Sequence, residues 1–226
     1  MKVKLLALAT VFLSYIMFVP MIASKGSFTL TVQNSLEGSV GVFSVCKGKS
    51  LYGGGTIVGT QGEILTVAHI VPDATCEVMV KTAGSTQVLG ARVVKIDTGR
   101  DLALLSVDKP TKNSVLLANR KLETGETIFT IGAPGHLQGT VTKGIVSNTG
   151  IETKATPGTI LYDVTVLPGS SGGGVFNENG DLAGIIRATI STSNSGNTLA
   201  VGISRNTINE FLKENIPNEN YTRKVF

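Results

Sequence analysis

The chain is poor in cysteine, histidine and aromatic residues, which are common in metal sites and nucleic-acid interfaces. Its 226 residues include no tryptophan, two cysteines and two histidines, and only 5% of them are aromatic. The basic residues are scattered and do not alternate with aromatic side chains, so no nucleic-acid partner is expected. The spacing of the two cysteines matches no zinc-binding pattern, so no metal site is expected either. We find no internal repeats.

Glycine, by contrast, is abundant, with 27 residues, and Val, Ile and Thr are frequent. This combination is typical of short strands joined by tight turns. Strand-like segments recur in two sets of six, separated by a strand-poor segment from Lys109 to Leu122. The first set lies near 39–46, 53–59, 63–67, 76–80, 87–95 and 102–106. The second lies near 127–131, 140–147, 159–165, 173–176, 182–190 and 198–203. Two such sets predict an all-β fold of two β-barrels.

A helix is predicted near Ser204 to Glu214, after the last strand. Ser204 or Asn206 can cap its first turn, and Ile208, Phe211 and Leu212 form one apolar face. The residues from 216 to 226 are interpreted as a loosely ordered C-terminal tail.

The N-terminus has the pattern of a targeting segment. Lys2 and Lys4 precede an apolar run from Leu5 to Ala23, which is long for a signal-peptide core and near the lower limit for a spanning helix. Residues 1–25 are therefore a signal peptide or a membrane anchor, and the sequence leaves both open. The positive-inside rule keeps the lysines in the cytoplasm, so the rest of the chain is predicted to be extracytoplasmic: secreted, periplasmic or membrane-anchored.

Cys46 and Cys76 fit such a compartment. Each lies in a predicted strand, and an oxidising environment would allow one disulfide between them. Two buried free thiols are the alternative, and the sequence does not decide between them.

The chemistry of the chain centres on a serine in a glycine run, Pro168–Gly174. A serine hydroxyl is a poor nucleophile until a base takes its proton and donors stabilise the oxyanion. His69 follows an apolar segment, and Asp101 precedes the segment Leu-Ala-Leu-Leu. The chain order His, Asp, Ser is one of the known orders of a catalytic triad. His136, the other histidine, is interpreted as a loop residue.

These segments resemble a trypsin-like serine protease of the chymotrypsin fold, and most of all the protease domain of the high-temperature-requirement (Deg) family. The resemblance covers roughly residues 35 to 214. It is carried by Gly53–Val58, Gly62–Val71, Asp101–Leu105, Ile131–Gly135, Thr140–Ser147, Pro168–Gly173 and Asn179–Ile185. It implies two six-stranded antiparallel β-barrels within a protease domain at residues 26–215, with the active site in the cleft between them.

The chain departs from the family at two points. Ser170 stands where the family usually has Asn or Asp, which places two serines side by side. The Gly-x-Ser-Gly-Gly register selects Ser171 as the nucleophile. The family often carries a peptide-binding PDZ domain, and we expect none here. Family members often form trimers, so a homo-oligomer is one expected state.

The resemblance also implies a mechanism that needs no cofactor. His69 acts as base, Asp101 orients it, and Ser171 attacks a peptide carbonyl of a polypeptide substrate. The oxyanion hole is expected from the backbone at Gly169, Ser170 and Ser171. The pocket for the residue before the cut is expected to be lined by Val166, Ala188 and Ile190, which favours small or medium aliphatic residues. Arg187 lies close by in the sequence.

Two other function classes remain as alternatives. One is a catalytically silent peptide-binding protein with the same fold, and the other is a membrane-anchored scaffold. The presence of all three triad residues argues against the first of these. Labelling with an active-serine probe separates them from an enzyme.

Overall fold

The computed structural model describes residues 27–109, 113–153, 156–191, 198–217 and 221. No helix among these residues is long and apolar enough to cross a membrane, and the run from Leu5 to Ala23 lies outside them. The residues from Thr31 onward form one compact unit.

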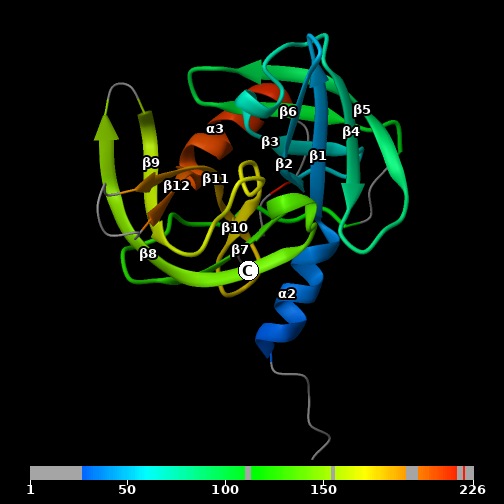
Figure 1. Cartoon of the computed structure of the whole chain (residues 1–226). Coiled ribbons are helices and arrows are strands. Elements are labelled where there is room, and N and C mark those ends of the chain that lie inside the picture. The colour runs from blue at the N-terminus through cyan, green and yellow to red at the C-terminus, as the bar shows by residue number, and fades with distance from the viewer. Residues whose placement is uncertain (1–26, 110–112, 154–155, 192–197, 218–220, 222–226) are drawn as a thin grey trace, which may run out of the picture. The chain divides into compact units, whose positions relative to one another are not determined.

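Six antiparallel strands close the first barrel, in the order β1-β2-β3-β6-β5-β4 (Figure 1). They are β1 (Ser39–Cys46), β2 (Lys49–Ile57), β3 (Glu63–Thr66), β4 (Glu77–Thr82), β5 (Val88–Asp97) and β6 (Leu102–Ser106). In β4, Val78 and Val80 are buried and alternate with exposed Glu77 and Met79, as expected for a strand with one face on the core.

The second barrel is closed by the other six strands, in the order β10-β11-β12-β9-β8-β7. They are β7 (Thr127–Gly132), β8 (Thr140–Thr153), β9 (Thr156–Asp163), β10 (Gly174–Phe176), β11 (Leu182–Ser191) and β12 (Thr198–Ser204). The prediction of two six-stranded antiparallel barrels is therefore confirmed. The largest differences in extent are in β2, which begins four residues earlier than predicted, and β8, which continues past residue 147.

Both barrels share an apolar cluster. It runs from the interior of the first barrel, through Leu104 and Val42, to Phe129 and Phe176 of the second. The rings of Phe129 and Phe176 are stacked with centroids 5.2 Å apart. A separate cluster around Tyr162 fills the second barrel. Because the first cluster crosses from one barrel to the other, the cleft between them has fixed walls.

The C-terminal helix α3 (Arg205–Asn215) also packs on the first of these clusters. Ser204 is its N-cap, and its hydroxyl accepts a hydrogen bond from the Thr207 N–H at 3.3 Å. Ile208, Phe211 and Leu212 are fully buried, as the sequence predicts. In the predicted tail, Tyr221 is buried and its carbonyl accepts a hydrogen bond from the N–H of Leu117, whereas residues 218–220 and 222–226 lie outside the described residues.

The sequence did not indicate the helix α2 (Ser27–Glu37), which precedes β1. Its first half contains Thr29, Thr31 and Val32, β-branched residues of low helix propensity. The hydroxyl of Ser39 donates to the carbonyl of Ser35 at 2.9 Å, which satisfies a carbonyl in its last turn.

Cys46 and Cys76 form a disulfide, with their Cα atoms 4.5 Å apart. It connects the end of β1 to the residue before β4. Lys47 and Asp73 form an ion pair of 2.9 Å next to it. Of the two states that the sequence left open, the structure has the bonded one.

Candidate active site

His69 and Asp101 lie at one end of the paired strands β3 and β6. The short helix η1 (Ala68–Ile70) follows β3 and carries His69, whereas Asp101 directly precedes β6. Thr66 of β3 pairs with Ala103 of β6, so the two loops leave the barrel side by side. The N–H of Ala68 donates to the Asp101 carbonyl at 3.1 Å, which joins the loops directly.

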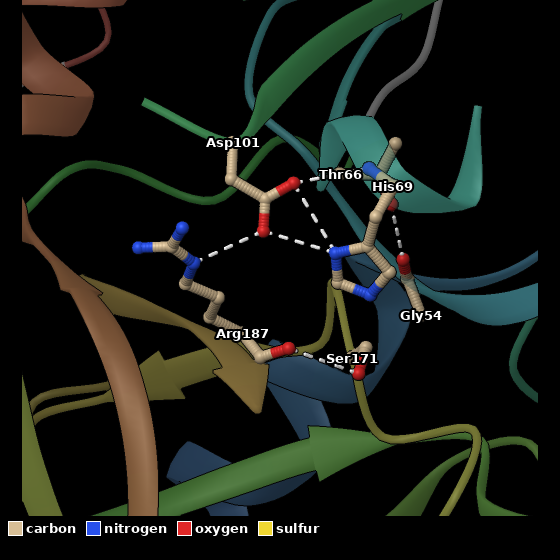
Figure 2. Close-up of polar contacts among 6 residues, drawn as sticks. All are labelled: Gly54, Thr66, His69, Asp101, Ser171 and Arg187. Carbon is tan, nitrogen blue, oxygen red and sulfur yellow. Dashed lines mark hydrogen bonds and ion pairs between the residues drawn. The ribbon is translucent and has the colours of Figure 1, made fainter. Parts of the chain in front are cut away.

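The Asp101 carboxylate holds His69 by its ring and by its backbone (Figure 2). Nδ1 of His69 lies 2.9 Å from Oδ2 and 3.2 Å from Oδ1, and the His69 N–H donates to Oδ1 at 3.0 Å. Asp101 has a φ of 55°, a left-handed conformation that is uncommon for residues other than glycine. These contacts fix the orientation of the imidazole, whose side chain remains 45% exposed.

The buried Asp101 is nevertheless ionised at neutral pH. Burial alone would raise the pKa of its carboxyl group, but the hydrogen bonds and charge of His69 and the charge of Arg187 outweigh burial and lower that pKa. A carboxylate is therefore present to stabilise a protonated imidazole.

Ser171 lies on the opposite wall, in the segment between β9 and β10. Its carbonyl accepts a hydrogen bond from the Gly54 N–H at 2.7 Å, and the Thr66 hydroxyl donates to the Gly54 carbonyl at 2.7 Å. In Figure 2 Ser171 lies on the side of the imidazole opposite its Asp101-bound Nδ1. The Ser171 hydroxyl donates to the carbonyl of Arg187 at 3.2 Å.

A tight turn precedes Ser171. The Ser170 N–H donates to the Leu167 carbonyl at 2.9 Å, and the Ser170 hydroxyl accepts from the Leu167 N–H at 3.2 Å. Ser170 is only 7% exposed, and Gly169 has a φ of 98°. In the described part of the chain, the N–H groups of Gly169 and Ser171 have no hydrogen-bond partner. The two serines thus differ: the hydroxyl of Ser170 braces the turn, and that of Ser171 lies in the cleft.

A cavity of about 660 Å³ opens beside these residues. It is lined by His69, Asp101, Val166, Leu167, Pro168, Ser170, Ser171, Ile186, Arg187, Ala188, Thr189 and Thr198. The structure thus brings the three candidate triad residues to one cavity with Val166 and Ala188. Ile190 does not line this cavity, and its side chain is 49% exposed on β11.

His136 lies elsewhere, in the short helix η2 (Pro134–His136) between β7 and β8. Its ring packs on that of Tyr52, with centroids 4.2 Å apart. It does not line the cavity, in agreement with its interpretation as a loop residue.

Arg187 is the site residue whose role the sequence did not show. Its Nε lies 3.2 Å from Asp101 Oδ2, so it forms an ion pair with the same oxygen that binds His69. Its position next to Ala188 placed it near the pocket, but no sequence pattern pairs it with Asp101.

The family model of the trypsin-like peptidase domain matches residues 53–185. The chain belongs to this family. The matched residues include all three triad candidates, and the family explains the two barrels and the cleft between them.

Curated relatives of this trypsin-like peptidase are described as probable periplasmic DegP-like serine endoproteases. One from Pseudomonas putida (strain W619) is 39% identical over 136 residues, which is 59% of this chain and 28% of the relative. One from Brucella suis is 31% identical over 167 residues, which is 72% of this chain and 32% of the relative. The chain therefore matches about a third of the length of these relatives.

Solved structures show the same fold. The serine endoprotease from Yersinia pestis is 26% identical, with a TM-score of 0.73 over 86% of this chain and 68% of that one. The HtrA-type protease AlgW, solved with a decapeptide, is 23% identical, with a TM-score of 0.71 over 84% of this chain and 68% of that one.

Proposed function

We propose that this protein is a serine endopeptidase that hydrolyses peptide bonds through His69, Asp101 and Ser171. The observation that carries the proposal is the hydrogen-bonded His69–Asp101 pair, which shares one cavity with the serine of the Gly-rich turn. The family match supports the same chemistry.

In the proposed reaction, Ser171 attacks the peptide carbonyl while Nε2 of His69 takes its proton. Asp101 holds Nδ1 and stabilises the protonated ring. The leaving amine takes the proton from His69, and water, activated by the same histidine, then hydrolyses the acyl-enzyme. Because the Ser171 hydroxyl donates to the Arg187 carbonyl, it must rotate about its Cα–Cβ bond toward Nε2 before it reacts.

The oxyanion is held by the backbone in this proposal. The N–H groups of Gly169 and Ser171 have no partner within the described residues, so both are available to a developing negative charge. Ser170 contributes its backbone between them, while its hydroxyl is bound to the Leu167 N–H. Removing one such donor from a hydrolase typically lowers kcat by about 10²–10³-fold.

The cavity favours small or medium aliphatic side chains before the cut. Val166, Ile186 and Ala188 supply apolar lining, and the one guanidinium among the described lining residues is paired with Asp101. None of these described lining residues offers an unpaired carboxylate to bind a basic side chain. Ile190 is not part of this proposal, because it lies outside the cavity.

We also propose that the domain, residues 26–215, acts outside the cytoplasm on polypeptides, in protein processing or quality control. The relatives named periplasmic support this, and so does the apolar run from Leu5 to Ala23 behind two lysines. This run is proposed as either a cleaved signal peptide or a membrane tether.

The test is labelling of the protein with a fluorophosphonate probe, together with hydrolysis of an unfolded protein such as reduced casein. Ser171→Ala is expected to abolish labelling and to lower kcat by about 10⁴–10⁶-fold. Ser170→Ala is the matched control, and it is expected to keep labelling and most activity, because only a turn-bracing hydroxyl is lost.

A labelled, active Ser171→Ala would refute the proposed nucleophile. A wild-type protein that takes no label but binds the unfolded protein would instead be the silent peptide-binding protein.

A further inference from the structure

We propose that Arg187 is a positioning residue of the triad, which extends the activity of His69 as a base to lower pH through an ion pair with Asp101. This inference rests on the proposed function. It assigns a role to a side chain that the reaction itself does not require.

The geometry places one carboxylate oxygen between the ring nitrogen of His69 and the guanidinium of Arg187. Asp101 Oδ2 lies 2.9 Å from His69 Nδ1 and 3.2 Å from Arg187 Nε. Figure 2 shows the guanidinium and the imidazole on opposite sides of the carboxylate. The Asp101 side chain is 10% exposed and that of Arg187 25%, so water screens this group of charges only partly.

A bulge in β11 accounts for the direction of the Arg187 side chain. Ile186 pairs with Gly202 of β12 and Ala188 pairs with the next residue, Val201, so Arg187 is left without a partner in the ladder. An extra residue of this kind locally redirects a side chain. Here it carries the guanidinium from the second barrel to a carboxylate of the first.

The charge of Arg187 opposes protonation of His69. A guanidinium stays protonated throughout the working range of an enzyme, so its charge is permanent. Once His69 accepts a proton, two cations share one carboxylate, and their repulsion disfavours the protonated ring. The free base is therefore expected to persist to lower pH than it would beside Asp101 alone.

Other charged groups do not replace Arg187 in this role. Among the described residues that line the cavity, Asp101 and Arg187 are the charged side chains facing His69. Arg100, next to Asp101, is bound to Asp97 and Glu214. The strand β1, which packs on the His69 turn, has no charged residue, and in β2 the charged residue is Lys49, exposed at its start.

The rival role for Arg187 is the binding of acidic substrates. The ion pair argues against it, because the guanidinium is already bound to a carboxylate within the protein. The two roles give different results: a substrate-binding cation changes KM for acidic peptides, whereas the proposed residue changes the pH profile for an uncharged one.

The experiment measures kcat/KM of the full chain for an uncharged peptide between pH 5 and 9. In Arg187→Met, which keeps a long side chain without the charge, the midpoint of the acidic limb is expected to rise by on the order of one pH unit. Arg187→Lys should restore part of the difference. Arg92→Met, which removes an arginine from the exposed ion pair with Asp108, is the matched control and should leave the midpoint unchanged.

A proton NMR titration of His69 in the Ser171→Ala background provides a readout without turnover. The midpoint is expected to move in the same direction when Arg187→Met is added. If methionine prevents folding, Arg187→Gln gives the same comparison. Equal midpoints with and without Arg187 would overturn the inference, even where kcat falls. Retained activity of Ser171→Ala would instead refute the proposed function.

Discussion

Gly172, directly after the proposed nucleophile, shows how little space the active-site turn leaves. It has a φ of 86°, and a Cβ atom there would lie 2.2 Å from the Gly54 carbonyl oxygen and 2.4 Å from the Thr66 hydroxyl. Those two groups form the hydrogen-bonded support of the Ser171 backbone. A side chain at this position must therefore push the two barrels apart at the site.

We expect Gly172→Ala to abolish probe labelling and to lower the free energy of unfolding by about 3 kcal/mol or more, because steric overlap adds to backbone strain. Gly84→Ala is the matched control. Gly84 has a φ of 75°, and a Cβ atom added there would meet nothing within 4 Å, so it isolates the strain, about 1–2 kcal/mol. Urea unfolding measures both. Equal losses in the two variants would contradict the close contact.

For single residues of the candidate site, the sequence predicts which residues take part better than it predicts the contacts between them. His69, Asp101 and Ser171 can be proposed as a triad from the sequence, because their chemistry and chain order are distinctive. The ion pair of Arg187 could not be predicted, since it depends on a bulge that alternation of apolar residues does not reveal. The selection of Ser171 over Ser170 as nucleophile stays a prediction, although the structure gives their hydroxyls different surroundings.

Among the helices and strands, α3 contacts the segment next to Asp101, and its amphipathic pattern does not reveal these contacts. Arg100 donates to Glu214 at 3.0 Å and to Asp97 at 2.6 Å, and its guanidinium carbon lies 5.4 Å from the centroid of the Phe211 ring. Arg100 directly precedes Asp101, whose backbone is in the left-handed region. The helix thus anchors the turn that presents Asp101, the carboxylate of the proposed triad.

We expect Glu214→Gln to lower the melting temperature by about 2–4 °C and kcat several-fold, because a charged hydrogen-bond acceptor of Arg100 is lost. Glu210→Gln, a position on the same helix outside this ion-pair group, is the control and should change neither. Thermal melts and steady-state kinetics provide the comparison. If the two variants have the same melting temperature and kcat, the contact between α3 and the Asp101 turn does not contribute to stability or activity.

Most strands can be predicted to within a few residues, because the alternation and the turn residues mark them clearly. The helix α2 cannot, because propensity argues against it and packing supports it. Ser35 is buried, and its hydroxyl contacts the Gly180 carbonyl at 3.4 Å, a partner 145 residues away in the sequence. Contacts of this range leave no local pattern in the sequence.

At the scale of the whole molecule, the Cys46–Cys76 disulfide both stabilises the fold and indicates the compartment in which the protein is found. It joins two cysteines 30 residues apart, and a loop of that length corresponds to about 3–4 kcal/mol of stabilisation. We expect protein isolated from its native cell to contain no free thiol when it is denatured and alkylated, because the proposed location is oxidising. Protein kept in a reducing cytosol is the control, and it should alkylate twice.

Two free thiols in the native protein would contradict the proposed export. N-terminal sequencing of the same sample distinguishes a cleaved signal peptide from a membrane tether. A start near residues 24–26 means a released enzyme, and an intact N-terminus in the membrane fraction means a tethered one.

The division of the proposed triad between barrels has a consequence for how the protein is made. His69 and Asp101 belong to the first barrel, whereas Ser171 and the turn before it are held by the second. A chain that emerges from its N-terminus therefore carries no complete site until almost all of it has appeared. The anchoring helix α3 comes later still. Under the proposed mechanism, a peptidase of this architecture therefore cannot act before the second barrel has emerged and folded.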